Sequence, residues 1–217
     1  MTDTCIFDMD GVLIDSGAHH RKAWGALLEE LGVEPTQRDF WRVTIGRPAE
    51  EALPLVLGRR LGPDEARRLA RRKRDLYAAY ATEGLLSVPG VTSFVDSLAR
   101  LGVSRAVGTS ASRGDALSLL ESVGLRRYFH VIVTADDVRL GKPDPEVYLE
   151  SARRLGAQPS ACVVFEDSVV GVQAARRAGM RVVGVTTAHA AAELEEAGAE
   201  MAIGDFEGLE WSTVAPP

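Results

Sequence analysis

Short apolar segments alternate with helical segments along the chain from Pro89 onward, and this alternation constrains the fold more than any other feature. A strand, a helix and a further strand in succession are typical of βαβ units, which build a parallel sheet with helices on its faces. The pattern therefore predicts an α/β fold with a Rossmann-like parallel sheet as its core. We expect strands at residues 104–108, 131–134, 162–165, 181–185 and 201–203, and helices at 90–101, 113–123, 145–155, 168–178 and 190–197.

A further strand is predicted near the start of the chain, where the apolar run Cys5-Ile6-Phe7 is followed at once by Asp8 and Asp10. Ligands of open parallel sheets bind outside the carboxyl ends of the strands, so both acids are expected at the reacting edge. Two ionised carboxylates so close together repel each other, and a cation, a shared proton or good solvation must offset that cost. Mg²⁺, which prefers oxygen ligands, fits best. A solvated turn is the alternative, because Asp and Gly are ordinary turn residues.

Residues 16–83 have helical rather than strand-like patterning and separate the first strand from the alternating region. A chain of 217 residues can hold one substantial core and a smaller inserted unit. We therefore interpret this segment as an insertion. Its expected helices cover residues 18–31, 49–60 and 63–81.

Polar side chains also follow three later strands. Ser110 lies in the loop before a helix that Ser112 is expected to cap, and an anion is favoured at such a helix start. Lys142 precedes Pro143, which restricts the backbone of that loop. The pair Glu166-Asp167 follows a buried strand, as Asp8 and Asp10 do. Each of these residues alone is compatible with an ordinary surface or capping role. Chance explains much less well why such residues follow each of four successive strands.

In this order the four loops resemble the four motifs of the haloacid dehalogenase-like hydrolase superfamily. The resemblance covers almost the whole chain. It is closest to the branch of sugar-phosphate phosphatases and β-phosphoglucomutase. The pattern of this branch is followed closely by residues 7–16. This branch carries a helical cap inserted after the first motif. The resemblance therefore implies a catalytic core of residues 1–15 and 84–217 and an α-helical cap domain of residues 16–83.

The resemblance also implies roles for the loop residues. Asp8 would attack phosphorus and form an aspartyl-phosphate, which divides one difficult step into two. Asp10 would protonate the leaving oxygen and then activate water. Lys142 and Ser110 would hold the phosphoryl oxygens. Mg²⁺ would be the cofactor, bound by the Asp8 carboxylate, the Asp10 backbone carbonyl and the Asp167 carboxylate, with Glu166 close by.

Further candidates for contacting the substrate come from the insertion and from the helix after Ser110. His20 and Lys73 lie on otherwise apolar helix faces, where a satisfied core histidine and a snorkelling lysine are the alternatives. The resemblance places both at the junction of cap and core. The substrate-binding set that we predict is His20, Arg47, Lys73, Ser112 and Arg113.

Hydrolysis and isomerisation are both compatible with these motifs. The pair His20 and Lys73 matches β-phosphoglucomutase, but the mutase pattern has an arginine where this chain has Ala49, and Arg47 is offset by two positions. A displaced anchor for a second phosphate favours a phosphatase acting on small phosphate esters. A dehalogenase has no need of Asp10. A non-catalytic phospho-receiver module carries no cap, and its phosphorylated Asp belongs in the third strand.

Composition narrows the setting in which the protein acts. The net charge of −6 and the pI of about 5.3 argue against a nucleic-acid partner. Cys5 and Cys162 lie in apolar runs, as buried free thiols do, and a reducing cytoplasm suits them. Met1-Thr2-Asp3 lacks the basic start of a signal peptide, and no apolar stretch is long enough for a membrane span. We expect a cytoplasmic monomer or weak homodimer with no membrane partner.

Overall fold

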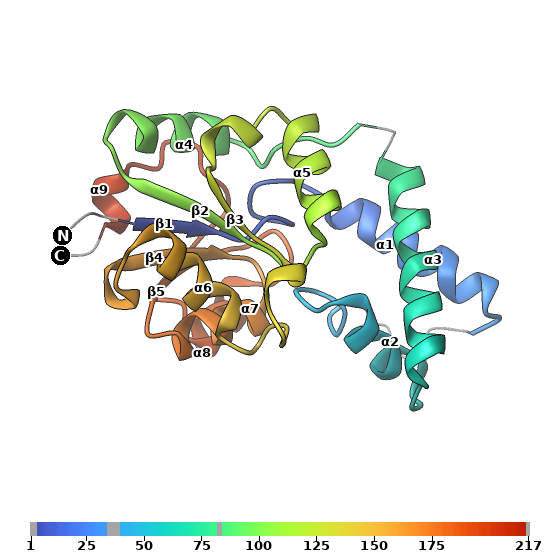
Figure 1. Ribbon diagram of the computed structural model, residues 1–217. Coiled ribbons are helices and arrows are strands. Elements are labelled where there is room, and N and C mark those ends of the chain that lie inside the picture. Colours follow the sequence, from blue (N-terminus) through green and yellow to red (C-terminus); the bar gives the residue numbers. More distant parts are fainter. Residues whose placement is uncertain (1–3, 34–39, 82–83, 216–217) are drawn as a thin grey trace.

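A parallel sheet forms the centre of the structure (Figure 1), a computed structural model that describes residues 4–33, 40–81 and 84–215. Its strand order is β3-β2-β1-β4-β5-β6, and all neighbouring strands run parallel. The order reverses at β1, so a crevice is expected outside the carboxyl ends of β1 and its neighbours. The predicted α/β class and Rossmann-like core are confirmed. The strands are β1 (Thr4–Phe7), β2 (Ser104–Gly108), β3 (Val131–Val133), β4 (Cys162–Glu166), β5 (Arg181–Val185) and β6 (Met201–Ile203).

Helices cover both faces of this sheet, which explains why its strands are almost continuously apolar. One face packs against α4 (Val91–Arg100), α5 (Arg113–Ser122) and α9 (Trp211–Val214), around stacked or tilted phenylalanine rings that include Phe7 and Phe165. The other face packs against α6 (Glu146–Leu155), α7 (Val169–Arg177) and α8 (Ala191–Ala197). Short 3₁₀ turns cover Arg126–Tyr128, Ala135–Asp137 and Pro159–Ala161.

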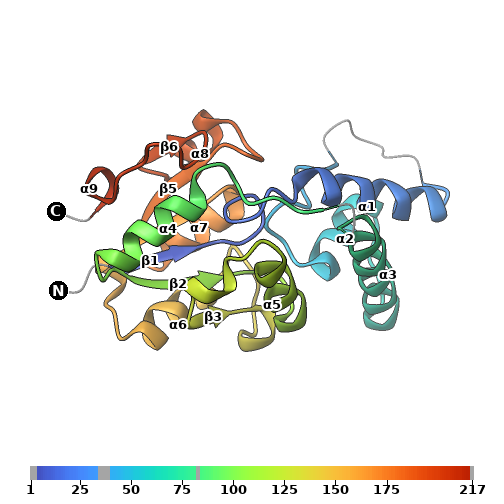
Figure 2. The same cartoon turned by 90° about the horizontal axis from the view of Figure 1, so that it is seen from above.

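The remaining helices form a separate group beyond the carboxyl edge of the sheet (Figures 1 and 2). They are α1 (Gly17–Glu30), α2 (Ala49–Leu57) and α3 (Pro63–Ala81), and they share an apolar cluster of their own that includes Trp24, Leu53 and Leu69. This group lies within the predicted insertion. The predicted boundary at 83/84 adjoins residues 82–83, which lie outside the described residues, as do Met1-Thr2-Asp3. None of the helices in the described ranges is long and apolar enough to cross a bilayer.

Helix ends differ from the prediction where a local cap intervenes. The helix expected over residues 49–60 ends at Leu57, because Gly58 adopts a left-handed conformation with a φ of 63°. Arg59 then donates its backbone N–H to the carbonyl of Pro54, which satisfies one of the free carbonyls of the last turn. The helix expected over residues 63–81 has those bounds in the structure.

Asp137 stabilises the turn after β3 through four donors. Its carboxylate accepts hydrogen bonds from the backbone N–H and hydroxyl of Thr134, and from the guanidinium groups of Arg113 and Arg154. Burial favours the neutral acid, but these donors outweigh it and hold the pKa of Asp137 well below its ordinary value. A carboxyl with a lowered pKa stabilises the fold above its unfolded-state pKa, and loses that contribution as the pH falls through the folded-state value.

We predict that Asp137→Asn lowers the free energy of unfolding at neutral pH by about 1–2 kcal/mol, because the amide replaces a charged acceptor. The difference from the wild type should shrink below about pH 4, where the unfolded-state carboxyl becomes protonated. Urea unfolding at neutral and acidic pH measures both effects. A difference that stays constant across this range would contradict the role of the charge.

Candidate active site

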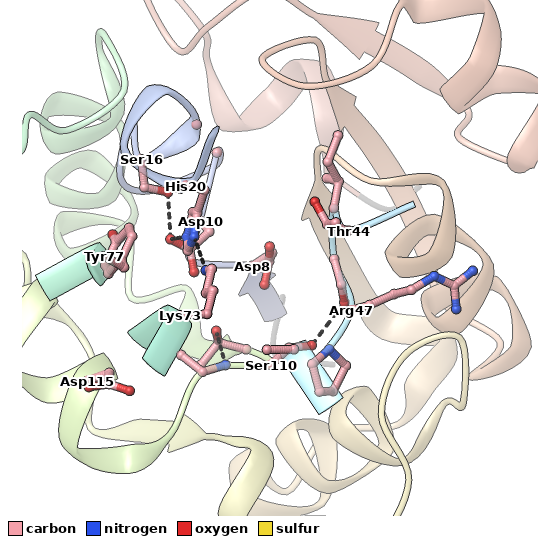
Figure 3. A pocket seen from close by; sticks show the side chains of 18 of the residues that line it. Asp8, Asp10, Ser16, His20, Thr44, Arg47, Lys73, Tyr77, Ser110 and Asp115 are labelled. Atoms are coloured by element: carbon pink, nitrogen blue, oxygen red, sulfur yellow. Dashed lines mark hydrogen bonds and ion pairs between the residues drawn. The ribbon is translucent and has the colours of Figure 1, made fainter. Parts of the chain in front are cut away.

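The loops that follow β1, β2, β3 and β4 converge on a cavity of about 310 Å³ between the sheet and helices α1–α3 (Figure 3). Asp8, Asp10, Ser110 and Asp167 line this cavity from the sheet side. Lys142 and Glu166 lie directly behind Asp8, where they are almost fully buried. The structure therefore brings together the polar residues of all four loops.

Lys142 is the cation at the centre of this arrangement. Its Nζ donates to Asp8 Oδ1 at 2.8 Å and to Glu166 Oε1 at 2.6 Å, and its side chain is 1 % exposed. Burial opposes its charge, but the two carboxylates outweigh burial and raise the pKa of Lys142. Burial also raises the pKa of Asp8 to about 7, against the opposing effect of Lys142 and with a contribution from Glu166. A further cation beside Asp8 would favour its ionised form.

Glu166 is held by protein donors on both of its oxygens. Oε1 accepts from Lys142 and from the Tyr148 hydroxyl at 2.6 Å, and Oε2 accepts from the backbone N–H and hydroxyl of Ser168. Gly171 makes room for this carboxylate, since an added Cβ would lie 1.8 Å from Oε1. Glu166 is thus better suited to fix Lys142 than to bind an ion directly.

A group of carboxylates here could hold a metal ion. Asp8, Glu166 and Asp167 each offer an oxygen, and these atoms lie within 4.8 Å of one another. Gly11 has a φ of 74°, and an added Cβ would lie 1.9 Å from Asp167 Oδ2, so the bare glycine lets that carboxylate approach the first loop. Because the protein already engages both oxygens of Glu166, Asp8 and Asp167 are the better-placed ligands. An all-oxygen set of this kind suits a hard divalent cation.

The carboxylate of Asp10 turns away from this group and toward the helices (Figure 3). Its Oδ1 accepts hydrogen bonds from the Ser16 hydroxyl at 2.5 Å and from His20 Nε2 at 3.0 Å. Lys73 Nζ lies 2.7 Å from His20 Nδ1. An ammonium group can only donate, so Nδ1 of His20 must accept. In a neutral ring the proton is then on Nε2, which faces Asp10.

Two pKa shifts follow from these contacts. Burial and the neighbouring Lys73 lower the pKa of His20, which favours its neutral ring. Burial would raise the pKa of Asp10, but the contacts with His20 and Ser16 outweigh it and lower that pKa to about 2. Asp10 is therefore ionised at neutral pH in this arrangement, with its carboxylate 31 % exposed to the cavity.

Ser110 connects the two sides of the cavity. Its hydroxyl donates to the carbonyl of Gly46 at 3.1 Å. This hydrogen bond joins the loop after β2 to the loop before α2. Ser112 caps α5, as predicted, by accepting a hydrogen bond from the backbone N–H of Asp115, and it also lines the cavity. Both serines thus line the cavity.

Two predicted substrate contacts point elsewhere. The guanidinium of Arg113 lies 2.6 Å from Asp137 and contributes to the turn after β3 instead of the cavity. Arg47 lines the cavity, but its guanidinium points away from Asp8 (Figure 3). The structure therefore groups His20, Lys73 and Ser112 near the acids, and it does not place these two arginines there.

Three further residues contact the site that the sequence interpretation did not assign to it. Tyr148 binds Glu166, and Thr187 and His189 both contact Asp167. Thr187 follows β5, whose carboxyl end lies at the same edge of the sheet, so the same positional rule could have identified it. No comparable signal marked Tyr148, because its spacing on α6 is that of an ordinary core residue.

Asp8, Glu166 and Asp167 form a buried acidic group, in which Lys142 bridges the first two. This acidic group, at the edge of a parallel sheet and beside a cavity under helices, defines an enzyme of the doubly wound α/β class. The particular family follows from comparison with known proteins. The chain belongs to the haloacid dehalogenase-like hydrolase family, whose model matches residues 5–185.

Named relatives share nearly the whole chain. The validoxylamine A 7'-phosphate phosphatase of Streptomyces hygroscopicus subsp. limoneus is 36 % identical over 220 residues, covering 100 % of both chains. The fructose-1-phosphate phosphatase of Escherichia coli is 36 % identical over 180 residues, which cover 83 % of this chain and 94 % of that one. The crystal structure of β-phosphoglucomutase from Clostridium difficile matches with a TM-score of 0.86 and 26 % identity, covering 99 % of this chain and 96 % of that one. The relatives thus include both phosphatases and a mutase.

Proposed function

We propose that this chain is a Mg²⁺-dependent phosphatase that hydrolyses small phosphate monoesters of the sugar-phosphate kind through an aspartyl-phosphate on Asp8. The main support is the position of the Asp8 side chain, which lines the cavity, accepts a hydrogen bond from the Lys142 ammonium at 2.8 Å and has an oxygen within 4.8 Å of one of Asp167. A phosphate ester resists attack because it is an anion, so a catalyst must supply a fixed nucleophile and positive charge. Both requirements are met at this position.

Each side chain has a defined task in the proposed reaction. Asp8 attacks phosphorus while Lys142 and the Ser110 hydroxyl hold phosphoryl oxygens. Asp10 first gives a proton to the leaving oxygen and later takes one from the attacking water. Asp10 is ionised in the resting site, and the approach of a phosphate anion raises its affinity for a proton. In the second step its ionised form is the one required.

The residues present fit a Mg²⁺ ion. The ligands offered are oxygens, and Gly11 leaves the space in which Asp167 reaches the loop of Asp8 and Asp10. The carboxylates of Asp8 and Asp167 would hold the ion, together with the Asp10 backbone carbonyl that the family resemblance implies. A bound ion would offset the negative charge of the carboxylates and of the phosphoryl group.

Hydrolysis is favoured over isomerisation by the loop before α2. Ala49 stands where the mutase pattern has an arginine, and the Arg47 guanidinium points away from Asp8 (Figure 3). This loop thus lacks the arginine that would bind a second phosphate group. A mutase remains the second candidate, because His20 and Lys73, the two residues that match the mutase pattern, contact each other, and His20 also contacts Asp10.

Phosphate release from a panel of sugar phosphates, with Mg²⁺ and after chelation, tests this proposal. Asp8→Asn is the inactive control. Release that depends on Mg²⁺ is expected, and full activity after chelation would contradict the metal requirement. A parallel assay with β-glucose 1-phosphate and a trace of the 1,6-bisphosphate follows glucose 6-phosphate against free phosphate. Predominant isomerisation would establish the mutase instead.

We predict that Asp10→Asn slows hydrolysis of the phosphoenzyme by about 10²–10⁴-fold, because no base then activates water. Good leaving groups should still depart, so the alcohol product should appear in a stoichiometric burst followed by a slow phase. Rapid-quench kinetics measures both phases. Ser16→Ala, which removes only one donor to Asp10, is the control and should keep a fast second phase. A fast second phase in Asp10→Asn would contradict its assignment as the base.

A further inference from the structure

The loop after β5 contacts both the loop after β1 and the loop after β4. The Thr187 hydroxyl donates to the Gly11 carbonyl at 2.6 Å, and its oxygen lies 3.3 Å from Asp167 Oδ2. His189 Nδ1 lies 3.0 Å from the backbone carbonyl of Asp167. Thr187 thereby joins the loop after β1 to the loop after β4.

These contacts occur where there is little free space. The position that a Cβ on Gly11 would occupy is 1.9 Å from Asp167 Oδ2 and 3.0 Å from Thr187 Oγ1. Asp167 is 5 % exposed and His189 is 8 % exposed, so water has little access to this side of the carboxylate. A change in the Thr187 side chain would therefore be transmitted to the Asp167 carboxylate.

The hydroxyl of Thr187 has a single proton, and two acceptors compete for it. The hydrogen bond to the Gly11 carbonyl is the shorter one, at 2.6 Å, and rotation of the hydroxyl turns the same proton toward Asp167 Oδ2 at 3.3 Å, so Thr187 can donate to either loop. Gly11 directly follows Asp10, whose carbonyl is the proposed third ligand. The hydroxyl is therefore placed to fix the spacing between two metal-ligating groups from different loops.

We propose that Thr187 is a positioning residue that holds the Asp167 carboxylate against the loop of Asp10 and Gly11, and so sets the affinity of the acidic group for a divalent cation. The proposal rests on the metal requirement of the proposed function. Outer-shell partners of this kind typically change metal affinity by about 10–100-fold when they are removed. Their effect comes from fixing a ligand that would otherwise rotate freely.

The adjacent residue supplies a matched control. Thr186 has the same side chain, but its hydroxyl donates to the carbonyl of Ile203, the last residue of β6, at 3.3 Å. Thr186→Val therefore removes a hydroxyl from the same loop without touching the acidic group. Thr187→Val removes the hydroxyl at nearly constant shape, and Thr187→Ser restores it without the methyl group.

Isothermal titration calorimetry of the full chain with MgCl₂, without substrate, measures the affinity directly. We expect Thr187→Val to bind Mg²⁺ about 10-fold more weakly than the wild type. Thr187→Ser and Thr186→Val should both stay close to the wild-type affinity. Circular dichroism of the metal-free variants checks folding, and Thr187→Ala takes the place of Thr187→Val if the valine variant does not fold.

The outcomes separate this proposal from the proposed function. Wild-type affinity in Thr187→Val, or equal weakening in Thr187→Ser, would overturn the positioning role while leaving phosphatase activity intact as a proposal. Weakened binding in Thr187→Val with a rescue by Thr187→Ser supports the role, even if the wild type hydrolyses none of the esters tested. A wild type that binds no Mg²⁺ would overturn both.

Discussion

Asp8→Asn is expected to abolish turnover, with a loss of about 10⁴-fold or more in kcat. The amide cannot attack phosphorus, and neighbouring Asp10 cannot substitute because its carboxylate is turned toward Ser16 and His20. Lys142 keeps its contact with Glu166 in this variant, so the protein should remain folded. Phosphate release under saturating substrate measures the loss.

Asp75→Asn is the control for this experiment, because Asp75 is an exposed acid of α3 that does not line the cavity. It should keep nearly the wild-type kcat. Turnover by Asp8→Asn within about tenfold of the wild type would remove Asp8 as the nucleophile, since loss of a covalent nucleophile is expected to cost far more. The acidic group would then have to act on water directly.

Lys142→Met is expected to have the second large effect, on both stability and rate. The ammonium is buried between Asp8 and Glu166, and methionine of similar length leaves both carboxylates without their shared cation. Breaking a buried pair by removing one partner costs about 3–5 kcal/mol. Losing a fixed charge at the phosphoryl oxygens should lower kcat by about 10²–10³-fold in addition.

Urea unfolding and steady-state kinetics separate these two effects. Arg139→Met is the control, because Arg139 lies in the same loop but its side chain is 91 % exposed, and its loss should change stability by less than about 0.5 kcal/mol. A stable and fully active Lys142→Met variant would show that the buried cation is dispensable. A stable but inactive one would restrict its role to catalysis.

The sheet could be predicted from the sequence because its signals are local. Runs such as residues 162–165 are apolar on both faces, and the parallel arrangement then places polar residues after each run at one edge. This positional rule found Asp8, Asp10, Lys142 and Asp167 without any knowledge of contacts. Helix ends were predicted less well, because a single left-handed residue such as Gly58 decides where a helix stops.

Side-chain direction could not be predicted in the same way. Arg113 directly follows Ser112, which lines the cavity, yet its guanidinium forms an ion pair with Asp137 in the turn after β3. Tyr148 reaches Glu166 through a contact between distant segments that no spacing encodes, whereas Thr187 lies at a strand end that the positional rule covers. The hydrogen bond from Ser110 to Gly46 likewise depends on how α2 packs against the core.

The most direct test of the proposed chemistry is to locate the phosphoryl group during turnover. The wild type and Asp10→Asn are mixed with a sugar phosphate that the wild type hydrolyses, and the reactions are quenched in acid. The proteins are then digested and their peptides are mapped by tandem mass spectrometry. We predict one added phosphoryl group on the peptide that contains Asp8, with more of it in Asp10→Asn. An unmodified Asp8, or a phosphoryl group on Ser110 or His20 instead, would contradict the central claim.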